Sequence, residues 1–165
     1  MDERVAIYPG SFDPPTLGHV DLIERAGRIF DRVIVAVACN EAKTALFTDS
    51  ERVEMLRELV QDLPNIEISQ FHGLSVEFAR KHGAIALIRG LRAVSDFEYE
   101  LSLAINNQKL NPDIDTVCLM PSEPYLFLSS RMVKEIAAFN GRIDHYVTPA
   151  VERRLRAKLA ERAKP

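Results

Sequence analysis

Short apolar runs alternate with helical patterns along the whole chain. The runs are rich in β-branched residues and predict strands, which we place at 5–8, 33–38, 66–69, 84–88 and 116–120. Amphipathic periodicity predicts helices between and after them, at 19–30, 49–63, 75–82, 96–110, 129–139 and 149–163. Runs such as VIVAVA are apolar at every position, which is typical of strands that helices cover on both faces. The pattern therefore predicts an α/β fold with five parallel strands.

The loops that follow the first and fourth strands are the most informative part of this pattern. In a Rossmann-like, doubly wound sheet with strand order 3-2-1-4-5, flanking helices and C-terminal helices, a ligand crevice lies between those two strands. The loops read PGSFDPPTLGH at 9–19 and RGLR at 89–92. Three of the seven glycines of the chain fall in them, namely Gly10, Gly18 and Gly90. Glycines at these places predict a close approach of the backbone to a ligand.

Length and composition limit the kind of protein this is. The chain has 165 residues without an internal repeat or a Gly/Ser linker, so we expect residues 1–165 to form a single domain. A formal net charge of −3 argues against a surface built for nucleic acid or for a membrane. We interpret the basic segment 152–165 as a docked amphipathic helix. No apolar run is long enough for a signal sequence or a membrane span, so we expect a cytoplasmic protein.

Two cysteines, Cys39 and Cys118, lie in apolar runs and lack the spacing of metal ligands. We expect both thiols to be buried.

The first loop predicts an anion site. Neither of the usual glycine-rich phosphate motifs, G-x-G-x-x-G and G-x-x-x-x-G-K-[ST], occurs in the chain. Instead Ser11, Thr16 and His19 precede or enter the first turn of a helix, where free N–H groups attract anions. The positive helix end favours a neutral His19, which can still donate an N–H to a phosphate oxygen. The alternative is that Thr16 caps the helix and His19 only packs.

The same loop carries a resemblance. P-G-S-F-D-P-x-T-x-G-H resembles the signature of the nucleotidyltransferase superfamily with the T/H-x-G-H motif. L-I-R-G-L-R at 87–92, D-F-E-Y-E at 96–100 and L-S-S leading into V-K-E at 128–135 follow in the order and spacing of the bacterial phosphopantetheine adenylyltransferase family. The resemblance implies transfer of the adenylyl group of ATP to 4′-phosphopantetheine, giving 3′-dephospho-CoA and pyrophosphate, the penultimate step of coenzyme A biosynthesis. The acceptor phosphate attacks the α-phosphorus in line, so no protein nucleophile is needed.

The resemblance also implies roles for individual residues. His19 corresponds to a transition-state stabiliser and acts with Lys43 and Arg92. Acceptor contacts correspond to Ser11, Lys43, Ser75 and Arg89. ATP contacts correspond to three groups: Ser11, Phe12 and His19; Gly90, Leu91, Arg92 and Glu100; Tyr125, Leu126, Phe127, Leu128, Ser129, Ser130 and Arg131.

Several of these assignments have alternatives. Arg131 stands where the family usually has Ser or Thr, which leaves its side-chain role open, although its charge can lie near the leaving pyrophosphate. A purely structural ion pair is the alternative for Arg89 and Arg92. We interpret Asp96 and Glu98 as cap or surface residues rather than as catalytic acids.

The resemblance further implies Mg²⁺ as the partner of ATP, a homohexamer built as a dimer of trimers, and coenzyme A as a feedback inhibitor. It implies neither a nucleic-acid nor a membrane partner, and no protein metal site. The other functions that the residues leave open are a sister nucleotidyltransferase, such as a nicotinate mononucleotide adenylyltransferase, and a non-catalytic nucleotide-binding subunit. The R-G-L-R and D-F-E-Y-E segments argue against the sister activity, and the presence of His19, Lys43, Arg89 and Arg92 argues against a non-catalytic subunit.

Overall fold

The computed structural model describes residues 3–39, 44–92 and 94–162, and its centre is one sheet of five parallel strands. The strand order is β3-β2-β1-β4-β5, which confirms the predicted α/β class and strand order. β1 pairs with β2 from Val5↔Arg32 to Gly10↔Val37 and with β4 at Ala6↔Ala86 and Ile7↔Leu87. The direction of strand addition therefore reverses between β1 and β4, where the ligand crevice is expected.

The strands reach further toward the crevice than the sequence pattern predicts. They are β1 (Val5–Gly10), β2 (Arg32–Ala38), β3 (Ile66–Phe71), β4 (Ala86–Gly90) and β5 (Asp115–Leu119). The carboxyl ends of β1, β3 and β4 each extend two residues beyond the predicted positions. They do so because residues that read as loop, such as Pro9 and Gly90, still pair with a neighbouring strand. The start of β4, by contrast, lies two residues later than predicted.

The described residues form six helices, which lie at nearly the predicted positions. They are α1 (Leu17–Ile29), α2 (Asp49–Leu59), α3 (Ser75–Lys81), α4 (Val94–Leu110), α5 (Ser130–Ala138) and α6 (Pro149–Arg162), with a short 3-10 turn η1 (Glu123–Tyr125) before α5. The spacing of Thr48 and Glu51 predicts a reciprocal helix cap at the start of α2, and the structure confirms it: the Thr48 hydroxyl accepts the Glu51 N–H, and the Glu51 carboxylate accepts the Thr48 N–H.

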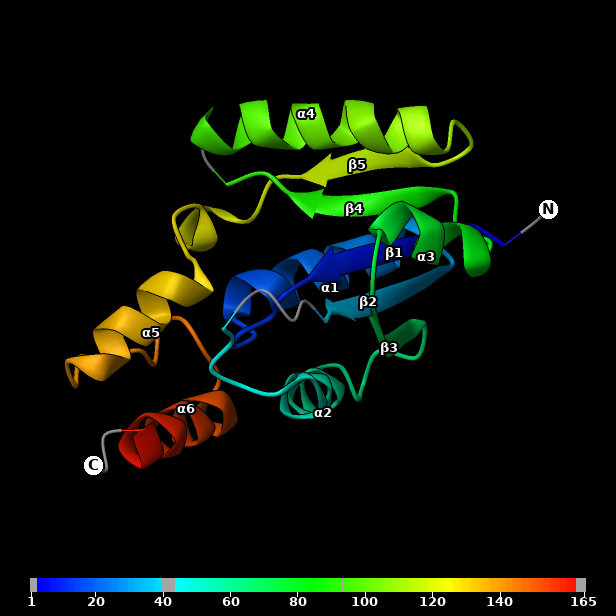
Figure 1. Ribbon diagram of the computed structural model, residues 1–165. Coiled ribbons are helices and arrows are strands. Elements are labelled where there is room, and N and C mark those ends of the chain that lie inside the picture. The colour runs from blue at the N-terminus through cyan, green and yellow to red at the C-terminus, as the bar shows by residue number, and fades with distance from the viewer. Residues whose placement is uncertain (1–2, 40–43, 93, 163–165) are drawn as a thin grey trace.

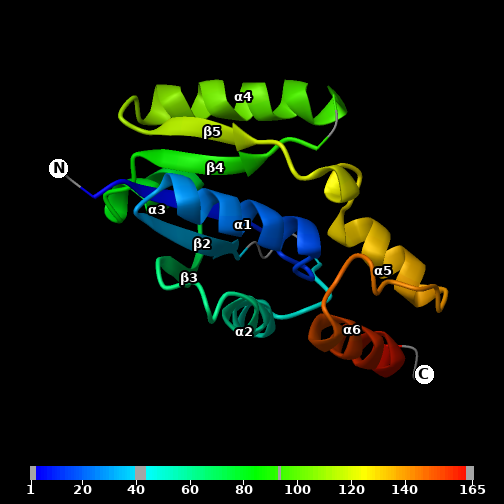
Figure 2. The ribbon, with the colours of Figure 1, turned by 180° about the vertical axis from the view of Figure 1, so that it is seen from behind.

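Helices cover both faces of the sheet, as the apolar strands require. One core cluster packs α1 and α2 on one face, for example Leu22 and Leu56 against Val35. A second packs Val76 and Ala79 of α3 on the other face. Figure 1 shows α3 in front of the sheet, and Figure 2, from behind, shows α1 in front. α4 lies alongside the edge strand β5.

A third apolar cluster holds the end of the chain in place. It joins α5 and α6 to α2 and the segment before it, and its fully buried members include Met55, Val133, Ile143 and Leu155. Figure 1 shows α5 and α6 beyond the carboxyl ends of the strands. α5 is thereby held at the crevice. Within the described residues, no helix has the length and apolar character needed to cross a membrane.

The two cysteines differ in exposure. Cys39 is buried, as predicted, but the prediction of a buried Cys118 is wrong, because this residue is exposed. Cys118 belongs to β5, which has a strand neighbour on one side only. An apolar run at a sheet edge is less covered than one at the centre, which the sequence pattern did not distinguish.

Candidate active site

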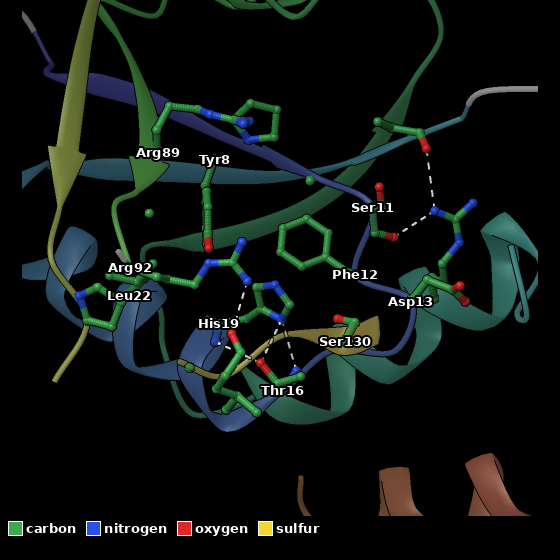
Figure 3. Close-up of a pocket in the computed structure, with 18 of the residues that line it drawn as sticks. Tyr8, Ser11, Phe12, Asp13, Thr16, His19, Leu22, Arg89, Arg92 and Ser130 are labelled. Atoms are coloured by element: carbon green, nitrogen blue, oxygen red, sulfur yellow. Dashed lines mark hydrogen bonds between the residues drawn. The ribbon is translucent and has the colours of Figure 1, made fainter. Parts of the chain in front are cut away.

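A cavity of about 760 Å³ lies beyond the carboxyl ends of β1 and β4. The loop between β1 and α1 forms its floor, and residues from β4, α2 and α5 complete the wall (Figure 3). Ten residues that the sequence assigned to the site line it: Ser11, Phe12, His19, Arg89, Gly90, Arg92, Glu100, Tyr125, Leu128 and Ser130. The fold thus brings together residues more than a hundred positions apart in the sequence.

Other assigned residues lie outside this lining. Those among the described residues are Ser75, Leu91, Leu126, Phe127, Ser129 and Arg131. Phe127 is 81% exposed, and the Arg131 side chain is also exposed. Ser129 has a structural contact instead: its hydroxyl accepts the Met132 N–H and caps α5. Lys43 lies outside the described residues.

His19 is oriented by a reciprocal cap at the start of α1. Its Nδ1 accepts the Thr16 N–H at 2.9 Å, and its own N–H donates to the Thr16 hydroxyl at 3.4 Å. The ring packs edge-on against Phe12, with 5.0 Å between centroids. Because Nδ1 accepts, the proton of the neutral ring is on Nε2, which is left as a donor. Thr16 therefore caps the helix, as the alternative reading had it, and the same contact orients a histidine that lines the cavity.

The His19 ring is neutral at physiological pH. Burial, together with the positive charge of Arg92, lowers the pKa of His19 to about 4. The sequence predicted a neutral ring from the helix end, whereas the structure adds desolvation and a neighbouring cation. At pH 7 this group offers a hydrogen-bond donor to a phosphate without adding a charge.

Two arginines, at the end of β4 and just after it, also line the cavity. Arg89 donates from Nε and Nη2 to the two Glu100 oxygens at 2.7 and 2.9 Å, and Glu100 is only 7% exposed. Burial lowers the pKa of Arg89, but the Glu100 carboxylate outweighs it and raises that pKa above its ordinary value. Arg89 is thus a paired cation at the cavity wall.

Arg92 is held from two directions. Its Nε donates to Asp96 at 3.2 Å and its Nη1 to the Leu128 carbonyl at 3.0 Å, which connects the start of α4 to the segment before α5. Asp96 lies in the first turn of α4, and Glu98 is exposed. Figure 3 shows the Arg92 guanidinium next to the His19 ring.

Four charged residues of the cavity were not identified from the sequence. These are Asp13, Asp49, Arg52 and Lys134. The Asp13 carboxylate accepts the N–H groups of Leu46 and Phe47 and pairs with Lys134 Nζ at 2.7 Å. Burial alone would raise the pKa of Asp13, but Lys134 and the two backbone donors lower it below its usual value. Asp13 and Lys134 lie inside motifs that had been noted, yet their partners are distant in sequence and no local pattern could reveal them.

Two loop glycines make room for neighbouring side chains. A Cβ on Gly10 would lie 2.8 Å from the ring of Phe12, and one on Gly90 would lie 2.8 Å from Leu22 Cδ1. Phe12 itself has φ 48°, in the left-handed region, and is 2% exposed. Gly10 and Gly90 both line the cavity, and close approach of a ligand to their backbone stays a prediction.

The cavity is suited to anionic groups that must be brought together. It combines a neutral histidine donor, three arginines and the start of α1. Among residues 3–39, 44–92 and 94–162, no three His, Cys, Asp or Glu side chains form a group that could hold a metal ion. The carboxylates of Asp13 and Glu100 are already bound to Lys134 and Arg89.

Comparisons with known proteins agree with this chemistry. Residues 7–136 match the family described as cytidylyltransferase-like. The chain is 54% identical over 156 residues to the phosphopantetheine adenylyltransferase of Caldanaerobacter subterraneus subsp. tengcongensis, covering 94% of this chain and 98% of the relative. It is 52% identical over 159 residues to the protein of the same name from Desulforudis audaxviator, covering 96% and 98%.

Solved structures share the fold. A putative nicotinate-nucleotide adenylyltransferase from Vibrio parahaemolyticus is similar with a TM-score of 0.69 and 16% identity, covering 97% of this chain and 93% of the other. The nicotinic acid mononucleotide adenylyltransferase of Plasmodium falciparum, complexed with NaAD, has a TM-score of 0.65 and 13% identity, covering 99% and 97%. At these identities the likeness establishes the fold alone.

Proposed function

The chain belongs to the phosphopantetheine adenylyltransferase family, and on that premise we propose that it transfers the adenylyl group of ATP to 4′-phosphopantetheine. The products are 3′-dephospho-CoA and pyrophosphate, and the step belongs to coenzyme A biosynthesis. The observation that carries this conclusion is an identity of 54% over nearly the full length of both chains. The cavity supports it, because its histidine donor and its arginines are suited to binding and orienting phosphates.

The transfer needs charge stabilisation at the α-phosphate. An oxygen of the acceptor phosphate forms a bond to the α-phosphorus of ATP while the bond to the leaving pyrophosphate breaks. Negative charge spreads over the non-bridging oxygens in between. We assign the His19 Nε2–H and the Arg92 guanidinium to those oxygens, since both groups face the cavity and both are fixed by hydrogen bonds to other residues. Lys43 is assigned to the same step by resemblance.

The acceptor and the nucleotide have separate contacts in this proposal, apart from Ser11, which is assigned to both. Lys43, Ser75 and Arg89 are assigned to the acceptor. The helix start, the residues after β4 and residues 125–131 are assigned to ATP. Glu100 stays with the ATP-site residues. Because both its oxygens accept from Arg89, we propose that it acts by orienting that guanidinium.

The metal is proposed as part of the substrate. Because Asp13 and Glu100 are already paired, the described donors do not fit a dedicated protein cage. Mg²⁺ usually keeps several waters and binds substrate phosphates, so we propose that it arrives as Mg-ATP. We also propose that residues 1–165 act as one domain in the cytoplasm, that the assembly is a homohexamer of two trimers, and that coenzyme A inhibits it.

The test is pyrophosphate release from Mg-ATP with a panel of acceptors. We expect release with 4′-phosphopantetheine and little with nicotinate mononucleotide or with no acceptor. Faster release with nicotinate mononucleotide would assign the chain to a sister activity. ATP binding without release for any acceptor would favour a non-catalytic subunit.

A further inference from the structure

Arg52 is a buried cation at the cavity with no role in the assignments above. It lies in the first turn of α2, lines the cavity, and its side chain is only 4% exposed. A buried guanidinium is costly unless its donors are satisfied. Arg52 meets this requirement mainly with backbone carbonyls, which makes its surroundings unusual.

Its hydrogen bonds join three segments of the chain. Nη1 donates to the Ser11 carbonyl at 2.6 Å and to the Ala38 carbonyl at 3.4 Å, and Nε donates to the Thr48 carbonyl at 3.4 Å. Nη2 pairs with Asp49, whose side chain is 41% exposed. Ser11 follows β1 directly and Ala38 ends β2. The rigid, planar guanidinium of Arg52 therefore connects the carboxyl ends of two neighbouring strands to the cap of α2.

Two consequences follow for a phosphate at this end of the sheet. Ala38 ends β2 and Thr48 caps α2, so Arg52 fixes the carbonyls of these two residues relative to that of Ser11. Carbonyl oxygens at the carboxyl ends of strands also carry partial negative charge, which repels an approaching anion. A guanidinium that binds the Ser11 and Ala38 carbonyls offsets that repulsion.

We infer that Arg52 is a positioning residue for the acceptor phosphate. It holds Ser11, Ala38 and Thr48 in the spacing that receives this phosphate, and it acts through the backbone rather than by contacting ATP. Its polar contacts, Ser11 apart, belong to no segment assigned to the nucleotide. The inference rests on the proposed function, because it takes the acceptor side of the cavity from that proposal.

The test compares Arg52→Gln and Arg52→Lys with the wild-type enzyme in steady-state pyrophosphate release. We expect Arg52→Gln to raise the KM for phosphopantetheine at least tenfold, with the KM for ATP changed less than threefold. The KM of Arg52→Lys for phosphopantetheine should lie between the values of the wild type and of Arg52→Gln, because an ammonium keeps the charge but lacks the planar set of donors of a guanidinium. The matched control is Arg57→Gln, an exposed arginine of the same helix, which should leave both constants unchanged.

Each outcome decides the question. Equal rises in both KM values, or no rise in a folded Arg52→Gln variant, would overturn the inference. If Arg52→Gln does not fold, as judged by circular dichroism, the split between the two KM values is read on Arg52→Lys. The wild-type acceptor panel separates the two proposals. If nicotinate mononucleotide is the better acceptor, the proposed function fails, and the Arg52 split is measured with that acceptor.

Discussion

The lowered pKa of His19 predicts that the protein loses stability as the pH falls. One substitution, His19→Gln, should remove this contribution to the pH dependence. Lowering the pH protonates His19 in the unfolded chain near the ordinary value of 6.5, whereas in the folded protein its pKa is about 4. Protons therefore bind the unfolded state first. The stability that depends on this group is fully present above pH 6.5 and is lost as the pH falls through 4.

The magnitude follows from the two pKa values. Between pH 6.5 and 4 the free energy of unfolding should fall by about 1.4 kcal/mol per pH unit, which gives about 2 kcal/mol at pH 5 and about 3 kcal/mol once the folded protein is protonated. These are upper limits, because the imidazole is partly exposed to the open cavity and solvent screens part of the effect.

Urea denaturation at pH 8, 6 and 5 measures this loss, with His19→Gln as the comparison. Glutamine at this position can still accept the Thr16 N–H and complete the capping box, but it does not titrate. The two proteins should have similar stabilities at pH 8, and by pH 5 the wild type should lose up to about 2 kcal/mol more than the variant. Carboxylates with lowered pKa values, such as Asp13, are common to both proteins and cancel in the difference. Parallel pH dependences, or a His19 NMR titration midpoint near 6.5, would refute the reasoning.

Further variants test other parts of the site. Glu100→Gln leaves Arg89 without its carboxylate partner and should lower the free energy of unfolding by about 2 to 4 kcal/mol in urea melts; unchanged stability would show that the pair is not structural. Gly10→Ala places a methyl group against the Phe12 ring and should cost about 1 to 3 kcal/mol, measured in the same way, whereas a neutral result would mean that Phe12 moves freely. Arg131→Ser should change kcat and the KM for ATP less than twofold, because the side chain is exposed; a tenfold loss would instead assign its charge to the leaving pyrophosphate.

The sequence pattern predicted the fold because the hydrophobic pattern and the helix caps of each segment agree with the element that the segment forms. The run VIVAVA is apolar on both faces and proved to be the interior strand β2, and the Thr48 and Glu51 cap marked the start of α2 correctly. The pattern failed at residues whose local composition does not indicate whether the folded protein pairs or buries them. Pro9 and Gly10 have the composition of a turn but pair with β2, and Cys118 has the composition of a core but lies in an edge strand.

The site was predicted in part. Motif residues such as His19, Arg89 and Arg92 were identified from loops whose spacing is visible in the sequence, and the structure brings them to one cavity. Arg52 was missed because it lies in a helix with no motif, and only the sheet brings its side chain to the Ser11 and Ala38 carbonyls.

By itself, the sequence determined the order of the strands and helices and the loops that carry phosphate chemistry. It also showed that cations are grouped in these loops although the net charge of the chain is −3. Periodicity and short motifs encode these features because they depend on residues close together in the chain. Only the tertiary structure decided the partner of each charge: Glu100 for Arg89, Lys134 for Asp13, and the ends of two strands for Arg52. Such pairs depend on burial and on contacts between distant segments, which no local pattern contains.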